Sequence, residues 1–479
     1  MVAVKRWTMR QAVILSGLVC CGITNGYIFG QMSGMLNALY SREDGIHLTT
    51  EEISWIASSI NITSVFGFAL AAIITEKIGR KRSITFFSIP MIINWVLLYF
   101  AQGMMFFIIS RIFVGICFGG MLSMYVISTA EYTSPKNRGL FLIITTSVGP
   151  AIGTALGHIL GIFFHWRTVA LIGIVPTALA AILPLFSEES PAWLASKGRY
   201  DECDKAFRRL HGFNRDSETE LTVLKEIEKS KEQKVKDTGS YAFMKFITAW
   251  KKPFFWKVLI LSSVINVYIA AAGKLLYSTL AITMLINITD RTYNVFLFIL
   301  LIDGFVILGA CLSCVLVKKL KMRTLLFSAG VTANVLLVFL SGFMYFYPQE
   351  RGIYGWISCV TLALFFIVVN AGPYPVLETF MGEIFPLELK AYCFFISDVV
   401  LSVALFLSVK LADFMFMNLG YHGTFLVNAS IMSLCLIYFW FKLPESKDRT
   451  LQEIELYFKN NTFDEVDKVL NGQEDKVLI

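Results

Sequence analysis

The sequence predicts an all-α membrane protein that crosses the bilayer about twelve times, with its helices in two six-helix halves. Of the 479 residues, 56% are hydrophobic and only 16% are charged, whereas about a quarter of the residues in a soluble chain are charged. The apolar residues form repeated runs of about twenty, the length that a helix needs to cross ~30 Å of hydrocarbon. One long polar segment, residues 187–252, divides these runs into two sets.

Twelve apolar segments are predicted to span the membrane. Those before the polar segment are 11–36, 52–75, 83–101, 104–130, 139–163 and 167–186. Those after it are 254–286, 293–317, 323–346, 352–380, 389–416 and 421–442. We therefore expect four parts, namely an N-terminal six-helix bundle over 1–186, a cytoplasmic linker with short helices over 187–252, a C-terminal six-helix bundle over 253–442 and a cytoplasmic tail over 443–479.

The basic residues of the short loops predict the orientation, because cytoplasmic loops carry an excess of Lys and Arg. One side of the predicted bundle has Lys5, Arg6, Arg10, Lys77, Arg80, Lys81, Arg82, Lys136, Arg138, Lys318, Lys319, Lys321, Arg323 and Lys390. The other side has only Arg42, Arg167, Arg291 and Arg351. Both termini and the polar segment are therefore predicted to be cytoplasmic. The sequon that begins at Asn287 falls outside the cell and is a candidate for N-glycosylation.

Several classes of function are disfavoured. The formal charge of +7 is unevenly distributed, so we expect no nucleic-acid partner. Cys311 and Cys314 form a CxxC inside an apolar run, but no His or second CxxC completes a zinc set, and we expect no metal. No nucleophile–base set or phosphate-binding Gly-Lys-Ser/Thr loop occurs, so we expect no enzyme, no cofactor and no ATP-driven transporter. His158, in the fifth span, is more typical of a packed helix residue than of a proton relay.

Four short motifs follow the second, fourth, sixth and twelfth spans. They occupy residues 76–81 (Glu-Lys-Ile-Gly-Arg-Lys), 131–139 (Glu-Tyr-Thr-Ser-Pro-Lys-Asn-Arg-Gly), 189–194 (Glu-Ser-Pro-Ala-Trp-Leu) and 444–451 (Pro-Glu-Ser-Lys-Asp-Arg-Thr-Leu). In sequence and position they resemble the loop motifs of sugar porters of the major facilitator superfamily, most closely the facilitated trehalose and hexose transporters of insects. The resemblance covers nearly the whole chain and implies the major facilitator fold and a small-molecule sugar substrate.

A cytoplasmic lock is expected from this resemblance and from the needs of alternating access. Such a carrier must hold its two bundles closed on one side with contacts that can release, and exposed ion pairs are worth only ~0–1 kcal/mol each. We assign Glu76, Arg80, Arg111, Glu131 and Arg138 to the lock of the N-terminal half, and Arg323, Glu383 and Lys390 to its C-terminal counterpart. The alternative is that these are solvated loop charges. Residues 318–323 lack the acid and the glycine of the family motif, so the second lock is expected to be looser.

The first span bears on coupling. Proton-coupled sugar porters carry an Asp there in a Gly-Tyr-Asp pattern, whereas this chain reads Gly26-Tyr27-Ile28. Because an apolar side chain cannot take up a proton, the resemblance implies a uniporter. Other acids within the predicted spans leave the question open.

The expected sugar contacts are largely replaced. A sugar site needs amides and an aromatic face. Thr146 stands at the position of the family's fifth-span Gln, Asn266 begins the altered seventh-span motif, and Glu378 replaces the tenth-span Trp. Gly372 and Pro373 are expected to break the tenth span near the cavity. The binding candidates are Thr146, Asn266, Tyr277, Asn370 and Glu378, although a neighbouring helix could equally satisfy each of them.

Lys274, Asp303, Glu378 and Asp398 are among the ionisable residues that fall inside predicted spans of the C-terminal half. Charges within a membrane usually pair with one another or line a water-filled path. We hypothesise that Lys274 pairs with Asp303 or Glu378. If Lys274 instead faces the cavity, an anionic substrate is favoured.

The leading hypothesis is a facilitative carrier of trehalose or a hexose in the plasma membrane, with the lipid bilayer and a small sugar as its partners. A same-fold carrier of an organic anion or amino-acid-like solute is the first alternative, favoured by the lost amides and by Lys274. The second alternative is a non-transporting nutrient sensor, disfavoured by the modest tail after Lys442. The oligomeric state stays open.

Overall fold

The computed structural model describes residues 2–133, 135–213, 218, 221–222, 224–225, 253–288, 295–347, 353–385, 390–445, 447 and 457–458. For residues 2–9, 135–138, 253, 353, 382–383 and 390–392 it describes the backbone only. Every regular element in these ranges is a helix, and twelve helical segments are long and apolar enough to cross a membrane. The predicted all-α fold with twelve spans is therefore confirmed.

Six spans form the N-terminal half. Four are single helices, namely α1 (Val2–Tyr40), α2 (Thr50–Ile78), α3 (Arg80–Tyr99) and α4 (Met104–Tyr132). The fifth consists of α5 (Pro135–Ile143), a π-helical turn η1 (Ile144–Val148) and α6 (Gly149–Phe163). The sixth consists of α7 (Trp166–Ile172), α8 (Ile174–Ile182) and the 3-10 turn η2 (Leu183–Phe186). A π-helical turn within a helix is frequently found at a functional site.

Six further spans form the C-terminal half. Their helices are α13 (Pro253–Ala271), α14 (Lys274–Ile288), α15 (Val295–Lys319), α16 (Met322–Phe346), α17 (Ile353–Ala371), α18 (Pro373–Glu383), α19 (Lys390–Lys410) and α20 (Ala412–Lys442). α20 includes the end of the eleventh span and all of the twelfth, which meet at a kink at Gly420 with φ 68°.

Two other breaks interrupt spans of this half. Gly273 lies between α13 and α14 with φ +71°, a conformation that glycine adopts without steric penalty. The seventh span, predicted as one segment over 254–286, is therefore two helices. Pro373 begins α18 directly after Gly372 and cannot donate the hydrogen bond that would continue α17. The break predicted in the tenth span is present.

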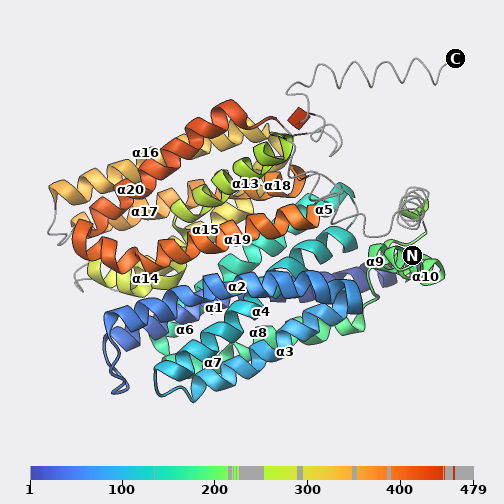
Figure 1. Ribbon diagram of the computed structural model, residues 1–479, viewed down its shortest axis with the longest axis horizontal. Helices are drawn as coiled ribbons and strands as arrows, with labels where there is room; N and C mark the ends of the chain where they lie inside the picture. The colour runs from blue at the N-terminus through green and yellow to red at the C-terminus, as the bar shows by residue number, and fades with distance from the viewer. Residues whose placement is uncertain are drawn as a thin grey trace.

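The two halves lie side by side in Figure 1, the first coloured blue to green and the second yellow to red. Helix α14 packs on α1, α15 packs on α6, and α19 packs on α2. These six helices therefore form much of the interface between the halves, and residues on their facing sides are positioned to change partners when the halves move.

Glycines let α1 and α6 approach closely within the N-terminal half. A Cβ atom at Gly26 would lie 1.9 Å from the carbonyl oxygen of Pro150, and one at Gly153 would lie 2.0 Å from that of Ile23. Small residues allow such packing in membranes, where van der Waals contact drives helix association. This packing fixes α6 at the interface with the second half.

Two short helices of the polar segment, α9 (Pro191–Ser196) and α10 (Tyr200–His211), lie at one end of the N-terminal half, near the start of α1 (Figure 1). We call this end, which is predicted to be cytoplasmic, the inner end, and the opposite end the outer end. Residues 226–252 and most of 443–479 lie outside the described residues, so the boundaries of the four predicted parts stay predictions.

Candidate functional site

A charged cluster lies at the inner end of the N-terminal half. The Arg80 guanidinium donates three hydrogen bonds of 2.7–3.1 Å to the carboxylate of Glu131 and one of 3.4 Å to Glu76 Oε1. The side chains of Arg80 and Glu131 are only 11% and 17% exposed. An arginine that binds a carboxylate through two nitrogens fixes orientation as well as charge. Three of the predicted lock residues therefore meet.

The polar segment is attached to this cluster. Glu189 Oε1 accepts hydrogen bonds from the backbone N–H groups of Arg80 and Lys81, at 2.9 and 3.3 Å, where α3 begins. A carboxylate at a helix N-terminus satisfies free N–H groups and interacts favourably with the helix dipole. The Ser190 hydroxyl also donates to Glu131. The partners in this cluster belong to the N-terminal half or its adjoining α9, so here they stabilise one half rather than join two.

Glu445 has the same role at the start of α16 in the second half. Its carboxylate oxygens accept hydrogen bonds from the backbone N–H groups of Met322 and Arg323, each at 3.0 Å. Glu189 accepts hydrogen bonds from the first two residues of α3 in the same way. Met322 in the second half therefore occupies the position that Arg80 has in the first half. Arg323 consequently stands at the position of Lys81, and its assignment to the lock of the C-terminal half stays a prediction.

The Arg323 side chain is held by aromatic rings instead of an acid. Its guanidinium carbon lies 5.7 Å from the ring centre of Phe327 and 5.9 Å from that of Trp440. One guanidinium nitrogen also donates to the Trp440 carbonyl at 2.9 Å. Such cation–π contacts at partly exposed sites are worth ~0.5–1 kcal/mol.

Arg111 does not join the inner cluster, contrary to the expectation from sequence. It precedes Glu131 by twenty residues on α4, which is about 30 Å along a helix, so it lies toward the outer end. It is 1% exposed, and its terminal nitrogens contact the sulfur atoms of Met32 and Met35 at 3.5 Å. The side chains of the other predicted lock residues, Arg138, Glu383 and Lys390, lie outside the described atoms.

Glu378 connects the two halves near the inner end. Its Oε2 accepts hydrogen bonds from the hydroxyls of Thr146 and Ser147 in η1, each at 3.3 Å. The π-helical turn therefore directs polar groups of the first half toward an acid of the second. Two of the predicted binding residues, Thr146 and Glu378, face each other across the interface.

Lys274 begins α14 directly after the break at Gly273. Its Nζ lies 4.7 Å from the ring centre of Tyr374, and it interacts electrostatically with Glu378. No described carboxylate oxygen lies within 4.0 Å of this nitrogen. Of the two predicted partners, Glu378 is thus the neighbour, without a direct ion pair.

Asp303 pairs with His158, which the sequence did not identify as its partner. Its Oδ2 lies 2.7 Å from His158 Nδ1, and His158 Nε2 lies 2.9 Å from the carbonyl oxygen of Ser278. The pairing of Asp303 with Lys274 is therefore wrong. His158 is packed as expected, fully buried and with a hydrogen-bond partner for each ring nitrogen. One signal was available, because a buried acid in a span needs a partner and His158 falls at a similar depth.

The remaining candidates have mixed environments. The Asn266 amide donates to the Ser397 backbone carbonyl and hydroxyl at 2.8 Å each, so it joins two helices. The Asn370 amide donates to the Phe366 carbonyl at 2.8 Å, but its oxygen is left without a partner. Asp398 is half-buried on α19, without a hydrogen bond to any residue described.

Other buried polar atoms also lack a protein partner in the part of the chain that the structure describes. They include both amide atoms of Asn61, the side-chain oxygen of Gln31, and the hydroxyls of Thr279 and Thr283. These residues lie on α1, α2 and α14, three helices of the interface. A buried group of this kind is destabilising unless water or a ligand satisfies it.

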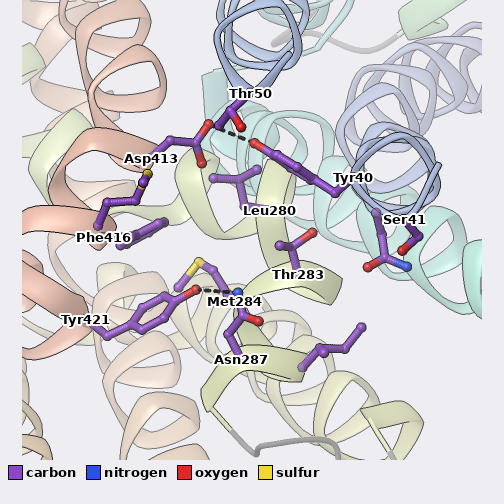
Figure 2. A pocket seen from close by; sticks show the side chains of 13 residues that line it. Tyr40, Ser41, Thr50, Leu280, Thr283, Met284, Asn287, Asp413, Phe416 and Tyr421 are labelled. Atoms are coloured by element: carbon purple, nitrogen blue, oxygen red, sulfur yellow. Dashed lines mark hydrogen bonds between the residues drawn. The ribbon is translucent and has the colours of Figure 1, made fainter. Parts of the chain in front are cut away.

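A cavity of about 350 Å³ lies between the halves at the outer end (Figure 2). It is lined by residues of α1, α2, α14 and α20 and of the loop after α1. Tyr40 closes one side by donating a hydrogen bond of 2.7 Å to Asp413 in the other half. Asn287 donates to the Tyr421 hydroxyl at 3.1 Å. The sequence could not reveal this cavity, because Tyr40 and Asp413 are far apart in the chain. Glycosylation of Asn287 stays a prediction, since Thr289 lies outside the described residues.

Comparison with known sequences agrees with this architecture. The family model described as Sugar (and other) transporter matches residues 4–458. The sugar transporter ERD6-like 6 of Arabidopsis thaliana is 26% identical over 458 residues, covering 93% of this chain and 89% of that protein. The facilitated trehalose transporter Tret1 of Bombyx mori is 23% identical over 459 residues, covering 94% and 86% respectively.

Solved structures show the same fold. The proton:xylose symporter XylE bound to 6-bromo-6-deoxy-D-glucose matches with a TM-score of 0.75 at 16% identity, covering 95% of this chain and 99% of that one. The inward open conformation of XylE from E. coli matches with a TM-score of 0.72 at 16% identity, covering 93% and 99%. The fold is that of the major facilitator superfamily.

Proposed function

This chain belongs to the Sugar (and other) transporter family, and from that premise we propose that it carries a sugar, such as trehalose or a hexose, by facilitated alternating-access uniport. The plasma membrane is its proposed site, with both termini and α9–α10 in the cytoplasm. Relatives named as facilitated trehalose transporters support trehalose as the first substrate to test. The fold and family are those of transporters rather than enzymes.

The observation that carries this proposal is the set of neutral polar groups without partners at the interface. Asn61, Thr279 and Thr283 offer both hydrogen-bond donors and acceptors. A sugar hydroxyl both donates and accepts, so a solute rich in hydroxyls can satisfy such groups without introducing charge. Groups of this kind on helices of both halves suit a solute that passes between them.

Uniport is supported by the first span. Ile28, at the position of the coupling acid in proton-coupled relatives, is 1% exposed and apolar. It has no group that exchanges a proton. The proposal is therefore that solute moves down its own gradient.

Uptake of labelled trehalose and glucose into proteoliposomes tests both the proposed sugar substrate and the proposed uniport. We expect saturable uptake that stops at equal concentrations inside and outside, even when a pH gradient is imposed. Thr146→Ala should raise the KM several-fold because it removes a hydroxyl at the interface, whereas Thr332→Ala, on exposed helix surface, should not. Accumulation above equilibrium would refute uniport, and lack of uptake of either sugar by well-folded protein would refute the substrate.

A second candidate, an anionic or amino-acid-like solute, is favoured by Lys274. This residue has no carboxylate in direct contact among the described residues, yet lies near Glu378. A cation and an anion at the interface match a solute that bears both charges. Uptake of labelled organic anions and amino acids by the same liposomes, abolished in Lys274→Gln, would favour this candidate over a sugar.

A further inference from the structure

A hydrogen-bonded chain of three residues crosses the interface between the halves. His158 lies on α6 of the first half, whereas Ser278 on α14 and Asp303 on α15 belong to the second. His158 is five residues from the outer end of α6, and Asp303 is eight residues from the outer end of α15. At 1.5 Å per residue the contact is about 7–12 Å from those helix ends. Parting of the halves at the outer end must therefore break it.

The geometry fixes how many protons this contact holds. The Ser278 carbonyl can only accept, so His158 Nε2 must carry hydrogen. A second proton must lie between His158 Nδ1 and Asp303 Oδ2, because two lone pairs 2.7 Å apart would repel. Whether this proton resides on nitrogen or on oxygen, the joined pair holds one proton more than a neutral histidine and a separate carboxylate.

Few other titratable groups face the pair from the helices around it. Tyr277 of α14 packs edge-on against the His158 ring at 5.8 Å between centroids and interacts with Asp303. Cys359 of α17 interacts electrostatically with Tyr277. Lys274, also on α14, lies against Tyr374 instead. From α1 the backbone atoms of Gly30 and Gln31 closely approach α6 at this level. At neutral pH no described cation near the pair therefore replaces the shared proton.

We propose that His158 and Asp303 form a proton-binding site that holds the outer end closed and releases its proton outward when that end opens. Once separated and hydrated, Asp303 stays ionised and His158 becomes neutral above its ordinary pKa near ~6.5. The closed state then holds one more proton than the open state, so raising the pH favours opening. By linkage, the ratio of open to closed states rises up to tenfold per pH unit above ~6.5.

This site regulates transport without coupling it to protons. The pair lies on the outer side, so it can stay joined when the inner end opens. The proton leaves and returns on the same side in each cycle, and no net proton is carried. The inference goes beyond the proposed function and does not depend on which solute is transported.

The test uses a cysteine that is buried until the outer end opens. Ser33 is fully buried, and its Oγ accepts a hydrogen bond from the backbone N–H of Ile282 in the other half. In a Ser33→Cys chain expressed in cells, we would measure modification by a membrane-impermeant methanethiosulfonate reagent between external pH 6.0 and 8.0. The unmodified chain gives the background from native cysteines.

His158→Gln in the Ser33→Cys chain supplies the reference, because thiol reactivity itself rises with pH. We expect the modification rate to rise more steeply with pH in the parent than in this variant, by up to tenfold per unit above ~6.5. His165→Gln is the matched control, since His165 and its partner Asp44 both lie in the first half. It should keep the slope of the parent.

Equal slopes in the parent and in His158→Gln would overturn the proposal, as would loss of the slope in His165→Gln. If His158→Gln does not reach the cell surface, Asp303→Asn replaces it as the reference and should give the same shallow slope. The readout requires no solute. Failure of sugar uptake in all of these chains therefore leaves this test unaffected.

Discussion

The inner ends of the two halves use the same helix cap but different side-chain clusters. Glu189 caps α3 and Glu445 caps α16, in each case by accepting from the first two backbone N–H groups. Beside the first cap, Arg80 and Glu131 form a largely buried ion pair. Beside the second, Met322 occupies the position of Arg80.

This difference separates what the backbone requires from what a single side chain adds. Every helix that begins at this end has free N–H groups, so an acid that satisfies them is useful in both halves. The ion pair depends on one arginine, and replacing it by methionine removes the pair while leaving the cap. The looser lock expected in the second half from residues 318–323 stays a prediction.

The largest effect is expected for Arg80→Ala. Removing the guanidinium leaves Glu131 mostly buried without its cation, which should lower the free energy of unfolding by about 2–4 kcal/mol. Met322→Ala, at the equivalent position of the other half, removes only apolar contact and should have a smaller effect. Thermal unfolding in detergent, followed by size-exclusion chromatography, measures both. Equal decreases in unfolding temperature for Arg80→Ala and Met322→Ala would show that the Arg80–Glu131 ion pair does not make the first half different from the second.

The two caps provide the next test, and here the halves should agree. Glu189→Ala and Glu445→Ala each leave two helix-initial N–H groups without an acceptor, and each should destabilise by about 1–2 kcal/mol. Unfolding of both variants under identical conditions checks this. A difference of more than ~1 kcal/mol between them would mean that the caps are not equivalent.

Arg323→Ala should have a weaker effect than Arg80→Ala. The guanidinium contacts two rings and one carbonyl at the protein surface, so its removal should lower stability by about 1 kcal/mol or less. Arg323→Lys, which keeps the charge, should recover only part of this loss because an ammonium group stacks less well. A loss as large as that of Arg80→Ala would contradict the aromatic arrangement.

The smallest effect is expected at the outer end of the first half. Although partial burial disfavours the charged form of Asp44, hydrogen bonds from His165, Trp166 and Arg167 hold its pKa below the usual value. Because its pKa is lower in the folded chain, the ionised Asp44 carboxylate stabilises the fold at pH values above the unfolded-state pKa of ~3.9. This stabilisation is lost as the pH falls through the folded-state pKa. Asp44→Asn should therefore destabilise by about 0.5–1 kcal/mol at pH 7.

Measuring the stability of Asp44→Asn and of the parent at several pH values tests whether the effect comes from the carboxylate charge. The stability difference between parent and variant should shrink as the pH is lowered below ~4, because the parent carboxylate then becomes protonated. Thermal unfolding at pH 7, 4 and 3 follows this change. A difference that grew on acidification would have the wrong sign for a stabilised carboxylate.

The sequence by itself determined the membrane architecture. Runs of about twenty apolar residues leave a chain few alternatives, because backbone polar groups in a bilayer must be satisfied within helices. Composition therefore predicts twelve spans and two halves. The sequence also predicts the break at Gly372 and Pro373, because proline disrupts the helix in which it lies. Gly273 escaped this reasoning because a lone glycine in an apolar run is often tolerated.

Only the tertiary structure decided which polar residues meet. His158 and Asp303 are separated by 145 positions, and no pattern in the sequence states how their helices face each other across the interface. Arg111 shows the same limit, because its charge indicates a partner while the packing of α4 on α1 surrounds it with methionine sulfur. Hydrophobicity acts on each segment independently, whereas a polar contact depends on the depth and rotation of two helices at once.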